Sequence, residues 1–154
     1  MKRQIAKGLT MLMLVVGLAF ASAAVANGQS GRQLSANIPF DFIVADKTLH
    51  SGQYQFRKEN SDGNVLAISS ADSKNSMVRL TSDAGSARDV RTRLVFHRYG
   101  SSYFLSQVWF DGNGRQLSRT KQERAAEREL KAIAAYHGDT KPVYEVVELI
   151  ATAP

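Results

Sequence analysis

The sequence predicts a mainly β, α+β domain, with an antiparallel barrel-like or sandwich-like arrangement of strands and one C-terminal amphipathic helix. Apolar and polar residues alternate over several short runs that are separated by turn-forming residues, which is typical of strands with one buried face. Only one stretch has helical periodicity, and it lies late in the chain. The 154 residues include no Cys, so packing rather than disulfides must stabilise the fold.

The first 26 residues have the three parts of an export signal. Positive, apolar and small residues follow one another: Lys2, Arg3 and Lys7, then residues 9–20, then residues 21–26. The apolar part would span about 18 Å as a helix, less than the roughly 30 Å of a bilayer core, so cleavage after Ala23 or Ala26 is favoured over an uncleaved anchor. We therefore expect a signal peptide at 1–26 and an exported protein, periplasmic or extracellular.

The charge of the chain is modest once this signal is set aside. The whole sequence has 20 Lys and Arg against 14 Asp and Glu, a net charge of +6. Three of the cations lie in the signal and no acid precedes Asp41, which leaves 17 against 14, or +3. This balance does not favour a nucleic-acid partner. The remaining 128 residues suit one domain, predicted at 34–154 after a polar, glycine-rich, flexible leader at 27–33.

The N-terminal half predicts four short strands. Apolar residues on every second position, from Ile38 to Val44, indicate a first strand, and Pro39 favours an edge position. Further strands are predicted at 52–57, 65–69 and 77–81, and turns or loops at 45–52, 60–64, 70–76 and 82–88. The Asp62-Gly63 pair supplies the positive φ values that a hairpin turn needs.

Residues 90–99 and 103–110 predict the strongest hairpin of the chain. Both faces of these strands carry large apolar side chains. Leu94 and Phe96 alternate with Val95 and Tyr99, and Trp109 follows on the second arm. Strands with two apolar faces are expected in the centre of a layer, covered on both sides.

A helix is predicted at about 120–137, because Thr120 and Glu123 have the spacing of a capping box and Gly138 suits the position after the last turn. One side of this helix is expected to dock on the sheet, and its residues are Ala126, Leu130, Ile133, Ala134 and His137. Residues 143–150 predict a closing strand after Pro142.

Several segments together resemble an uncharacterised family of small exported bacterial proteins. The pattern is PFDF-x-V at 39–44, L-x-x-G-x-Y at 49–54 and LVFHRYG-x-x-YFLSQVW at 94–109, and the resemblance covers roughly 38–129. His50-Ser51 departs from it, because Pro-Ala stands there in the family, and this puts the rigidity of the loop in doubt. The resemblance implies a free-standing exported domain and assigns no activity.

No catalytic or metal-binding motif in the sequence assigns an activity. His50, His97 and His137 stand apart without metal-ligand spacing. No serine lies in a nucleophile motif, and Asp111 to Gly114 are interpreted as a turn rather than a calcium loop. We therefore predict no enzyme activity, no metal and no cofactor, with a hydrolase-type enzyme that uses His97 as the alternative.

Two groups of residues are candidate binding sites. A small hydrophobic ligand would contact aromatic side chains of the hairpin: His97, Tyr99, Tyr103 and Trp109. An anionic envelope component would contact a basic stripe on the helix: Lys121, Arg124, Arg128 and Lys131. A filled interior and a merely solvated stripe are the structural alternatives. The predicted function is an exported, non-enzymatic binding or envelope-associated module, with a structural envelope protein as a further alternative.

Overall fold

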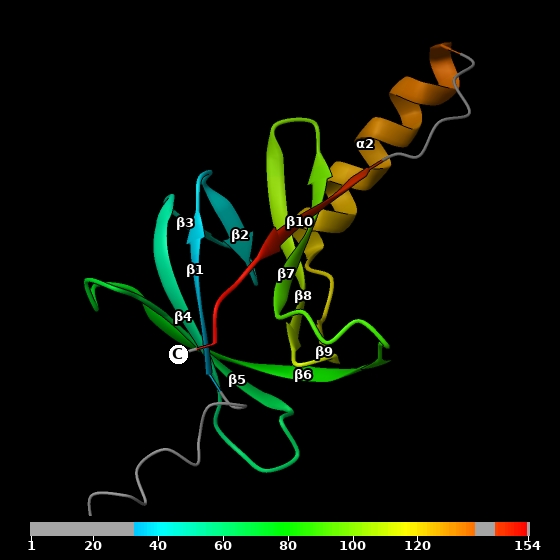
Figure 1. Cartoon of the computed structure of the whole chain (residues 1–154). Helices are drawn as coiled ribbons and strands as arrows, with labels where there is room; N and C mark the ends of the chain where they lie inside the picture. The colour runs from blue at the N-terminus through cyan, green and yellow to red at the C-terminus, as the bar shows by residue number, and fades with distance from the viewer. Residues whose placement is uncertain (1–32, 138–143, 154) are drawn as a thin grey trace, which may run out of the picture. The chain divides into compact units, whose positions relative to one another are not determined.

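Figure 1 presents the protein as a computed structural model, which describes residues 33–137 and 144–153. The predicted signal peptide at 1–26 and most of the predicted leader lie outside these residues. The described part contains ten strands and one helix: β1 (Gln33–Ile38), β2 (Phe42–Val44), β3 (Lys47–Leu49), β4 (Gly52–Lys58), β5 (Val65–Ser70), β6 (Ser76–Ser86), β7 (Arg93–Tyr99), β8 (Ser102–Phe110), β9 (Asn113–Leu117), α2 (Lys121–His137) and β10 (Glu145–Ile150).

The strands pair in the order β1-β4-β5-β6-β9-β8-β2-β3, and β7 pairs with β8 and β10. Strand β6 belongs to both halves, because its first part pairs with β5 and its second part with β9. All pairings are antiparallel except the bridge between Ile43 and Phe104, which is parallel. The sheet is therefore mixed, with antiparallel pairing in all but one place.

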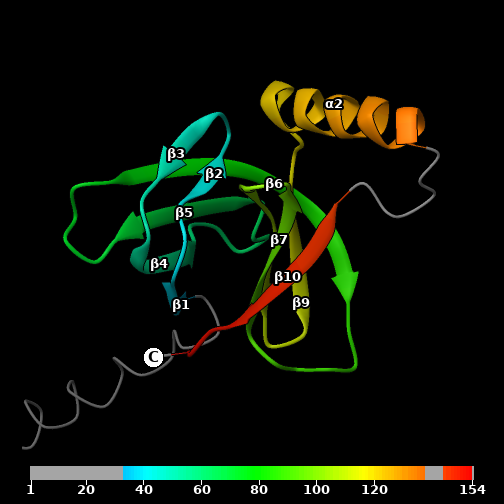
Figure 2. The same ribbon diagram turned by 90° about the horizontal axis from the view of Figure 1, so that it is seen from above.

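The sheet curls back on itself without closing (Figure 2). After β10 the chain meets β1 only at an isolated bridge, where Ser35 and Thr152 exchange two backbone hydrogen bonds of 2.8 and 2.9 Å. The predicted mainly β, α+β class is confirmed, and its sandwich-like form fits the unclosed sheet.

One large core lies between the two halves of the sheet. It contains alternate residues of the strands, as the sequence pattern predicts for strands with one buried face. Leu34, Phe56, Phe96 and Val108 are all completely buried in it. Phe42 lies among aromatic rings, with centroids 5.0 Å from Tyr54 and 5.7 Å from Phe96. Aromatic side chains therefore fill the interior.

Several predicted boundaries in the first half are wrong. The single strand expected over 38–44 is two strands, β1 and β2, because Pro39 has no N–H for a ladder and the chain leaves the sheet there. Gln33 already begins β1, so the leader ends before it. Polar composition concealed β3, the second half of β6 and the whole of β9. β3 and β9 each bury a single leucine in the core, Leu49 and Leu117, and all three segments are held mainly by pairing with neighbouring strands.

The predicted central hairpin is confirmed as β7 and β8, joined through Gly100, whose φ of 60° suits a two-residue turn. The register shifts within it, since Val95 pairs with Gln107 and Phe96 with Leu105. Ser106 is therefore the extra residue of a bulge in β8. The bulge changes which residues of β8 face the core, from Tyr103 and Leu105 before it to Val108 and Phe110 after it.

The predicted helix is confirmed as α2, but it docks over less of its length than predicted. Ala126 and Leu130 pack on an outer cluster made of Ile43, Tyr99 and Phe104. Ile133, which was expected to dock, is 49% exposed. In Figures 1 and 2 the second half of α2, to which Ile133 belongs, extends past the strands. The side chain of His137 lies outside the described residues.

Candidate functional site

The first turn of α2 is fixed by Thr120 and Asp46. The Thr120 Oγ1 accepts a hydrogen bond of 3.0 Å from the Glu123 backbone N–H, as the capping box predicts. The Asp46 carboxylate, in the turn after β2, accepts from the Gln122 N–H at 3.4 Å. Both contacts satisfy N–H groups that a helix start leaves unpaired. The reciprocal half of the predicted box is wrong, because the Glu123 carboxylate turns to the sheet.

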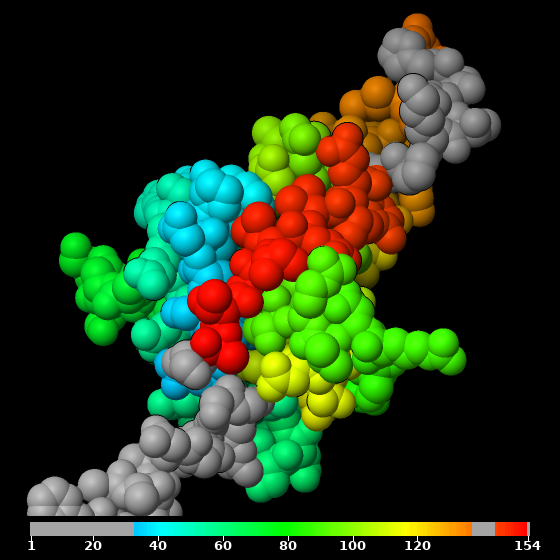
Figure 3. All heavy atoms as spheres, in the orientation of Figure 1, coloured from blue at the N-terminus to red at the C-terminus, as the bar shows by residue number. Residues whose placement is uncertain are grey.

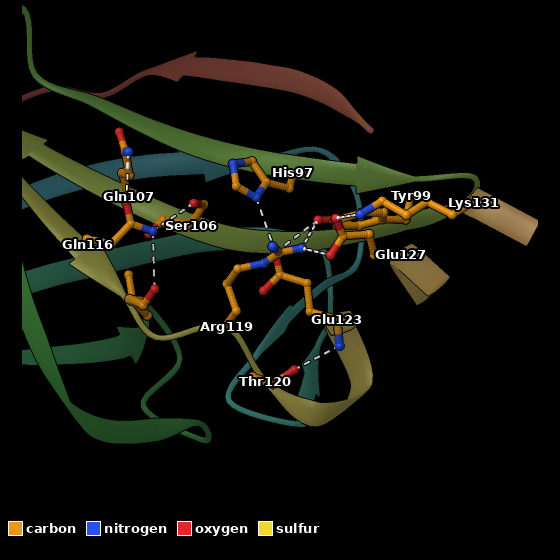
Figure 4. A network of polar contacts seen from close by, with 11 residues as sticks. His97, Tyr99, Ser106, Gln107, Gln116, Arg119, Thr120, Glu123, Glu127 and Lys131 are labelled. Atoms are coloured by element: carbon orange, nitrogen blue, oxygen red, sulfur yellow. Dashed lines mark hydrogen bonds and ion pairs between the residues drawn. The ribbon is translucent and has the colours of Figure 1, made fainter. Parts of the chain in front are cut away.

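Glu123 is the buried centre of a polar network between α2 and the sheet, with only 4% of its surface exposed. Three groups surround its Oε1, as Figure 4 shows. His97 Nδ1 lies 3.2 Å away, the Tyr99 hydroxyl donates over 3.4 Å, and Arg119 Nε donates over 3.3 Å. A carboxylate removed from water needs such partners, so these contacts make its burial tolerable.

Arg119 extends the network to the solvent. Its Nη2 donates to the Tyr99 hydroxyl at 2.7 Å and to Glu127, and Lys131 Nζ lies 2.9 Å from the other oxygen of Glu127. Hydrogen bonds from Lys131 and Arg119 hold the pKa of Glu127 below its usual value. Burial, together with the charge of Glu123, raises the pKa of Tyr99 to about 12. Tyr99 therefore stays neutral and links Arg119 to Glu123.

The network is closed on the His97 side. The Tyr144 ring lies against the imidazole, with centroids 4.4 Å apart, and the His97 side chain is 16% exposed. A general base must come within hydrogen-bond reach of the proton it removes. A hydrolase that uses His97 would need a carboxylate near the imidazole in an open cleft. The carboxylate is present, but α2 and Tyr144 cover the pair, which favours a structural role.

A small pocket borders Glu123 on its other side. It contains about 70 Å³ of water-accessible space. Its wall combines core and polar side chains, which include Ile43, Leu105, Leu117, Arg79 and Thr120. Pockets for drug-sized ligands have roughly 300–1,000 Å³. This pocket suits a few water molecules rather than the small hydrophobic ligand considered from the sequence.

The four predicted ligand residues do not form one site. His97 and Tyr99 lie together under α2, in the network described above. Tyr103 lies on the opposite face of the hairpin, where its ring stacks on Phe40 with a centroid distance of 3.9 Å. Trp109 lies on the outer face, as His97 does. Its partner across the hairpin is Arg93, however, which is four positions from His97 along β7. The pattern located the hairpin correctly, but alternation and the bulge divide its aromatic residues between two faces.

Trp109 takes part in a second polar network that the sequence did not reveal. Its Nε1 donates to Gln107 Oε1 at 2.8 Å, and Gln107 Nε2 donates to Gln116 Oε1 at 2.8 Å. Gln116 Nε2 in turn donates to the carbonyl and the hydroxyl of Ser106, both at 3.1 Å. Arg93 covers the indole with its guanidinium carbon 4.5 Å from the ring. Trp109 is 8% exposed and is thereby enclosed.

A second His–Asp/Glu pair, which the spacing in the sequence did not predict, lies at the open end of the β2–β3 hairpin. His50 Nδ1 is 3.2 Å from Asp41 Oδ2, and the Ser51 N–H donates to Asp41 Oδ1 at 2.8 Å. These contacts, led by the Ser51 hydrogen bond, lower the pKa of Asp41. The two side chains are 83% and 56% exposed. Water screens such a pair, so it lacks the enclosed setting of a catalytic dyad.

The predicted basic stripe divides into two groups. Lys131 is paired with Glu127, so its charge is compensated. Lys121, Arg124 and Arg128 are exposed, and none of them has an acidic partner within ion-pair distance in the described part of the chain. These three residues, hereafter the cationic face, line a hollow along the helix together with Glu127.

Residues 33–137 and 144–153 contain no group of three or more His, Asp or Glu side chains placed to hold a metal ion. They also contain no helix that has both the length and the apolar character needed to cross a bilayer. Comparison with protein-family models, curated proteins and solved structures finds no match for the chain.

Proposed function

We propose that the protein is an exported, non-enzymatic binding module that attaches to an anionic component of the cell envelope through the cationic face of α2. One observation carries the proposal. Lys121, Arg124 and Arg128 present three positive charges to solvent without an acidic partner among the described residues, while the neighbouring Arg119 and Lys131 are both compensated by carboxylates. Uncompensated charge on one side of a helix attracts ligands of opposite charge.

The buried network supports this proposal because it holds the helix in place. Glu123 connects the first turn of α2 to two residues of β7 and to Arg119. A helix that is fixed before binding loses less conformational entropy when it meets a partner. The cationic face is therefore carried by an element that is already in its binding position.

The free-energy cost of placing three positive charges on one side of α2 is small. Arg124 and Arg128 are four residues apart and repel each other by a few tenths of a kcal/mol. The first turn of a helix is also a less favourable place for Lys121 than the last turn, because the helix dipole is positive there. No contact among the described residues offsets this repulsion or the unfavourable interaction of Lys121 with the helix dipole. A bound anion would relieve both, which favours ligand binding at this face.

The alternatives have weaker support. A hydrophobic ligand would need space, and the pocket beside Glu123 is small. A hydrolase that uses His97 would need access to the imidazole, which Tyr144 and α2 restrict. A purely structural envelope protein would not need uncompensated cations on α2, so loss of binding on their removal separates that alternative from the proposal.

Binding of the exported protein to anionic probes tests the proposal. The probes are a lipid-free anionic polysaccharide and anionic phospholipid vesicles, each at low and at high salt. The triple variant Lys121→Gln, Arg124→Gln, Arg128→Gln should lose most of the binding. A control with the same charge change at exposed positions elsewhere, Lys47→Gln, Arg57→Gln, Arg88→Gln, should keep it. If the protein binds neither probe, or both triple variants bind equally, the proposal is wrong.

Export is tested separately by the mass of the protein recovered from bacteria. Cleavage after Ala23 or Ala26 predicts a product that lacks the first 23 or 26 residues, in the periplasmic or extracellular fraction. An intact chain that still begins at Met1 and remains in the cytoplasm would contradict this part of the proposal.

A further inference from the structure

Strand β10 has one edge that is paired and one that is free. It pairs with β7, and no other strand of the described residues forms a ladder with it. Backbone N–H and C=O groups point to alternate sides along a strand. Just after β10, the Thr152 N–H donates to the Ser35 carbonyl of β1 at 2.9 Å, on the side away from β7. By the same alternation, the backbone groups of Val146, Glu148 and Ile150 also point away from β7.

The side chains beside this free edge are only partly covered. Val146 and Ile150, on the outer face of β10, are 57% and 61% exposed. Val147 and Leu149 point to the core but are only partly buried there. Strand β10 lies at the surface of the domain (Figure 3), and it diverges from β1 away from the bridge at Thr152 (Figures 1 and 2). An added strand would therefore pair the free backbone groups and cover apolar surface on both faces.

We infer that the free edge of β10 binds an extended peptide segment of another protein, in which apolar residues alternate with basic ones. Such a site is separate from the cationic face of α2 and adds to the proposed function. In strand addition, backbone hydrogen bonds provide affinity and alternate side chains provide selectivity. The apolar residues of the partner would pack beside Val147 and Leu149, and its basic residues would lie beside Glu148 on the outer face.

Glu148 determines which charge the partner needs. Its side chain is 49% exposed, and its carboxylate lies 3.7 Å from Arg93 Nε, beyond hydrogen-bond distance. Opposite charges across a pair of strands stabilise the pairing, and like charges destabilise it. The methylene stems of basic residues would also cover Val146 and Ile150. A second copy of β10 would instead bring its own Glu148 to the same face of the ladder, which disfavours pairing between copies.

The other edges of the sheet are less suitable. Strand β3 has only three residues, which limits the number of backbone hydrogen bonds that a partner could form. Strand β1 is already bridged at Ser35 and is followed directly by Pro39, which has no N–H to donate. Strand β10 combines a longer free edge with exposed apolar side chains.

Amide hydrogen exchange of the processed, exported protein tests the free edge directly. The N–H groups of Val146, Glu148 and Ile150 should exchange faster than those of Val147 and Leu149, which face β7. The peptide probe is a capped octapeptide of alternating valine and lysine. At saturation it should slow exchange at the three free positions by at least about tenfold.

Two variants test the backbone pairing and the charge. Val146→Pro removes one N–H from the free edge without interrupting the ladder to β7, so it should weaken probe binding about tenfold with little change in the unfolding midpoint. Glu148→Lys should weaken binding of the lysine probe roughly fivefold and strengthen binding of a probe that alternates valine with glutamate. Glu129→Lys makes the same charge change on α2 and should alter neither.

A probe N-methylated at every lysine keeps its side chains but cannot donate hydrogen bonds to β10, so it should not bind. Equal binding of the methylated and unmethylated probes, or unchanged binding to Val146→Pro, would overturn the inference. Failure of the unmethylated probe to bind would overturn it as well. A wild-type dimer that Val146→Pro converts to a monomer would also overturn it, because a second copy would then occupy the edge.

Discussion

Nδ1 of His97 on β7 lies 3.2 Å from Oε1 of Glu123 in the first turn of α2, and this contact joins the sheet to the helix across 26 sequence positions. The carboxylate is almost completely buried, and the Tyr99 hydroxyl and Arg119 share the same oxygen. The helix is thus attached by a polar network on one side and by the packing of Ala126 and Leu130 on the other.

The first prediction concerns the stability that Glu123 provides. Glu123→Ala should lower the free energy of unfolding by about 3 kcal/mol, because it leaves the buried Tyr99 hydroxyl and the His97 imidazole without their acceptor. Glu129→Ala, at an exposed position of the same helix, should cost less than about 0.5 kcal/mol. Urea denaturation at neutral pH measures both values, and similar losses in the two variants would contradict the role assigned to Glu123.

The second prediction concerns alkaline stability. The pKa of Tyr99 is about 12 in the folded protein, against an ordinary value of 10.0. The neutral hydroxyl therefore stabilises the fold fully below about pH 10, and this contribution is lost as the pH rises towards about 12. Between these values the wild type should lose stability more steeply than Tyr99→Phe. Denaturation series at several alkaline pH values measure the two slopes, and parallel curves would refute the prediction.

The third prediction concerns the core. Phe42→Ala should destabilise the protein by about 3–5 kcal/mol, since its ring is fully buried and contacts Tyr54 and Phe96. Val78→Ala is the matched control, because Val78 is 54% exposed on β6 and should cost less than about 0.5 kcal/mol. The midpoints of chemical unfolding compare the two. A cost below about 1 kcal/mol at Phe42 would mean that the core is not packed as described.

The fourth prediction concerns Gly114 on β9. A Cβ at this position would lie 2.9 Å from two ring atoms of Trp109 and 2.9 Å from the Cβ of Ala84. Gly114→Ala should therefore cost about 1–3 kcal/mol and displace the indole. Trp109 is the single tryptophan of the chain, so its fluorescence reports the displacement directly. An unchanged emission spectrum with unchanged stability would show that the indole does not lie over β9.

Much of the fold could be predicted because it follows from local patterns. Alternating apolar residues predicted the buried faces of β4, β7 and β8, and the spacing of Thr120 and Glu123 predicted the start of α2. Strands β3 and β9 could not be predicted, since each is short and polar and is stabilised by its neighbours. Pro39 favours an edge position, but its full effect depends on where the chain turns after β1, which is a property of the tertiary structure.

The candidate site was predictable only in part. The basic stripe on α2 follows from helical periodicity, but the pairing of Lys131 with Glu127, and of Arg119 with Glu123, separates compensated from uncompensated charge. The role of Glu123 in attaching α2 to the sheet was not predicted, because its position in a capping box already accounts for a glutamate there. Its partner His97 lies on a distant strand, and no spacing within the sequence connects the two.

The most direct test of the account is the fraction of the processed protein that sediments with envelope membranes from the cells that export it. The wild type should sediment at low salt and be released at high salt, because screening weakens contacts between exposed charges. The Lys121→Gln, Arg124→Gln, Arg128→Gln variant should remain in the soluble exported fraction, whereas the Lys47→Gln, Arg57→Gln, Arg88→Gln control should behave as the wild type. Equal, salt-insensitive sedimentation of all three proteins would contradict attachment through the cationic face of α2.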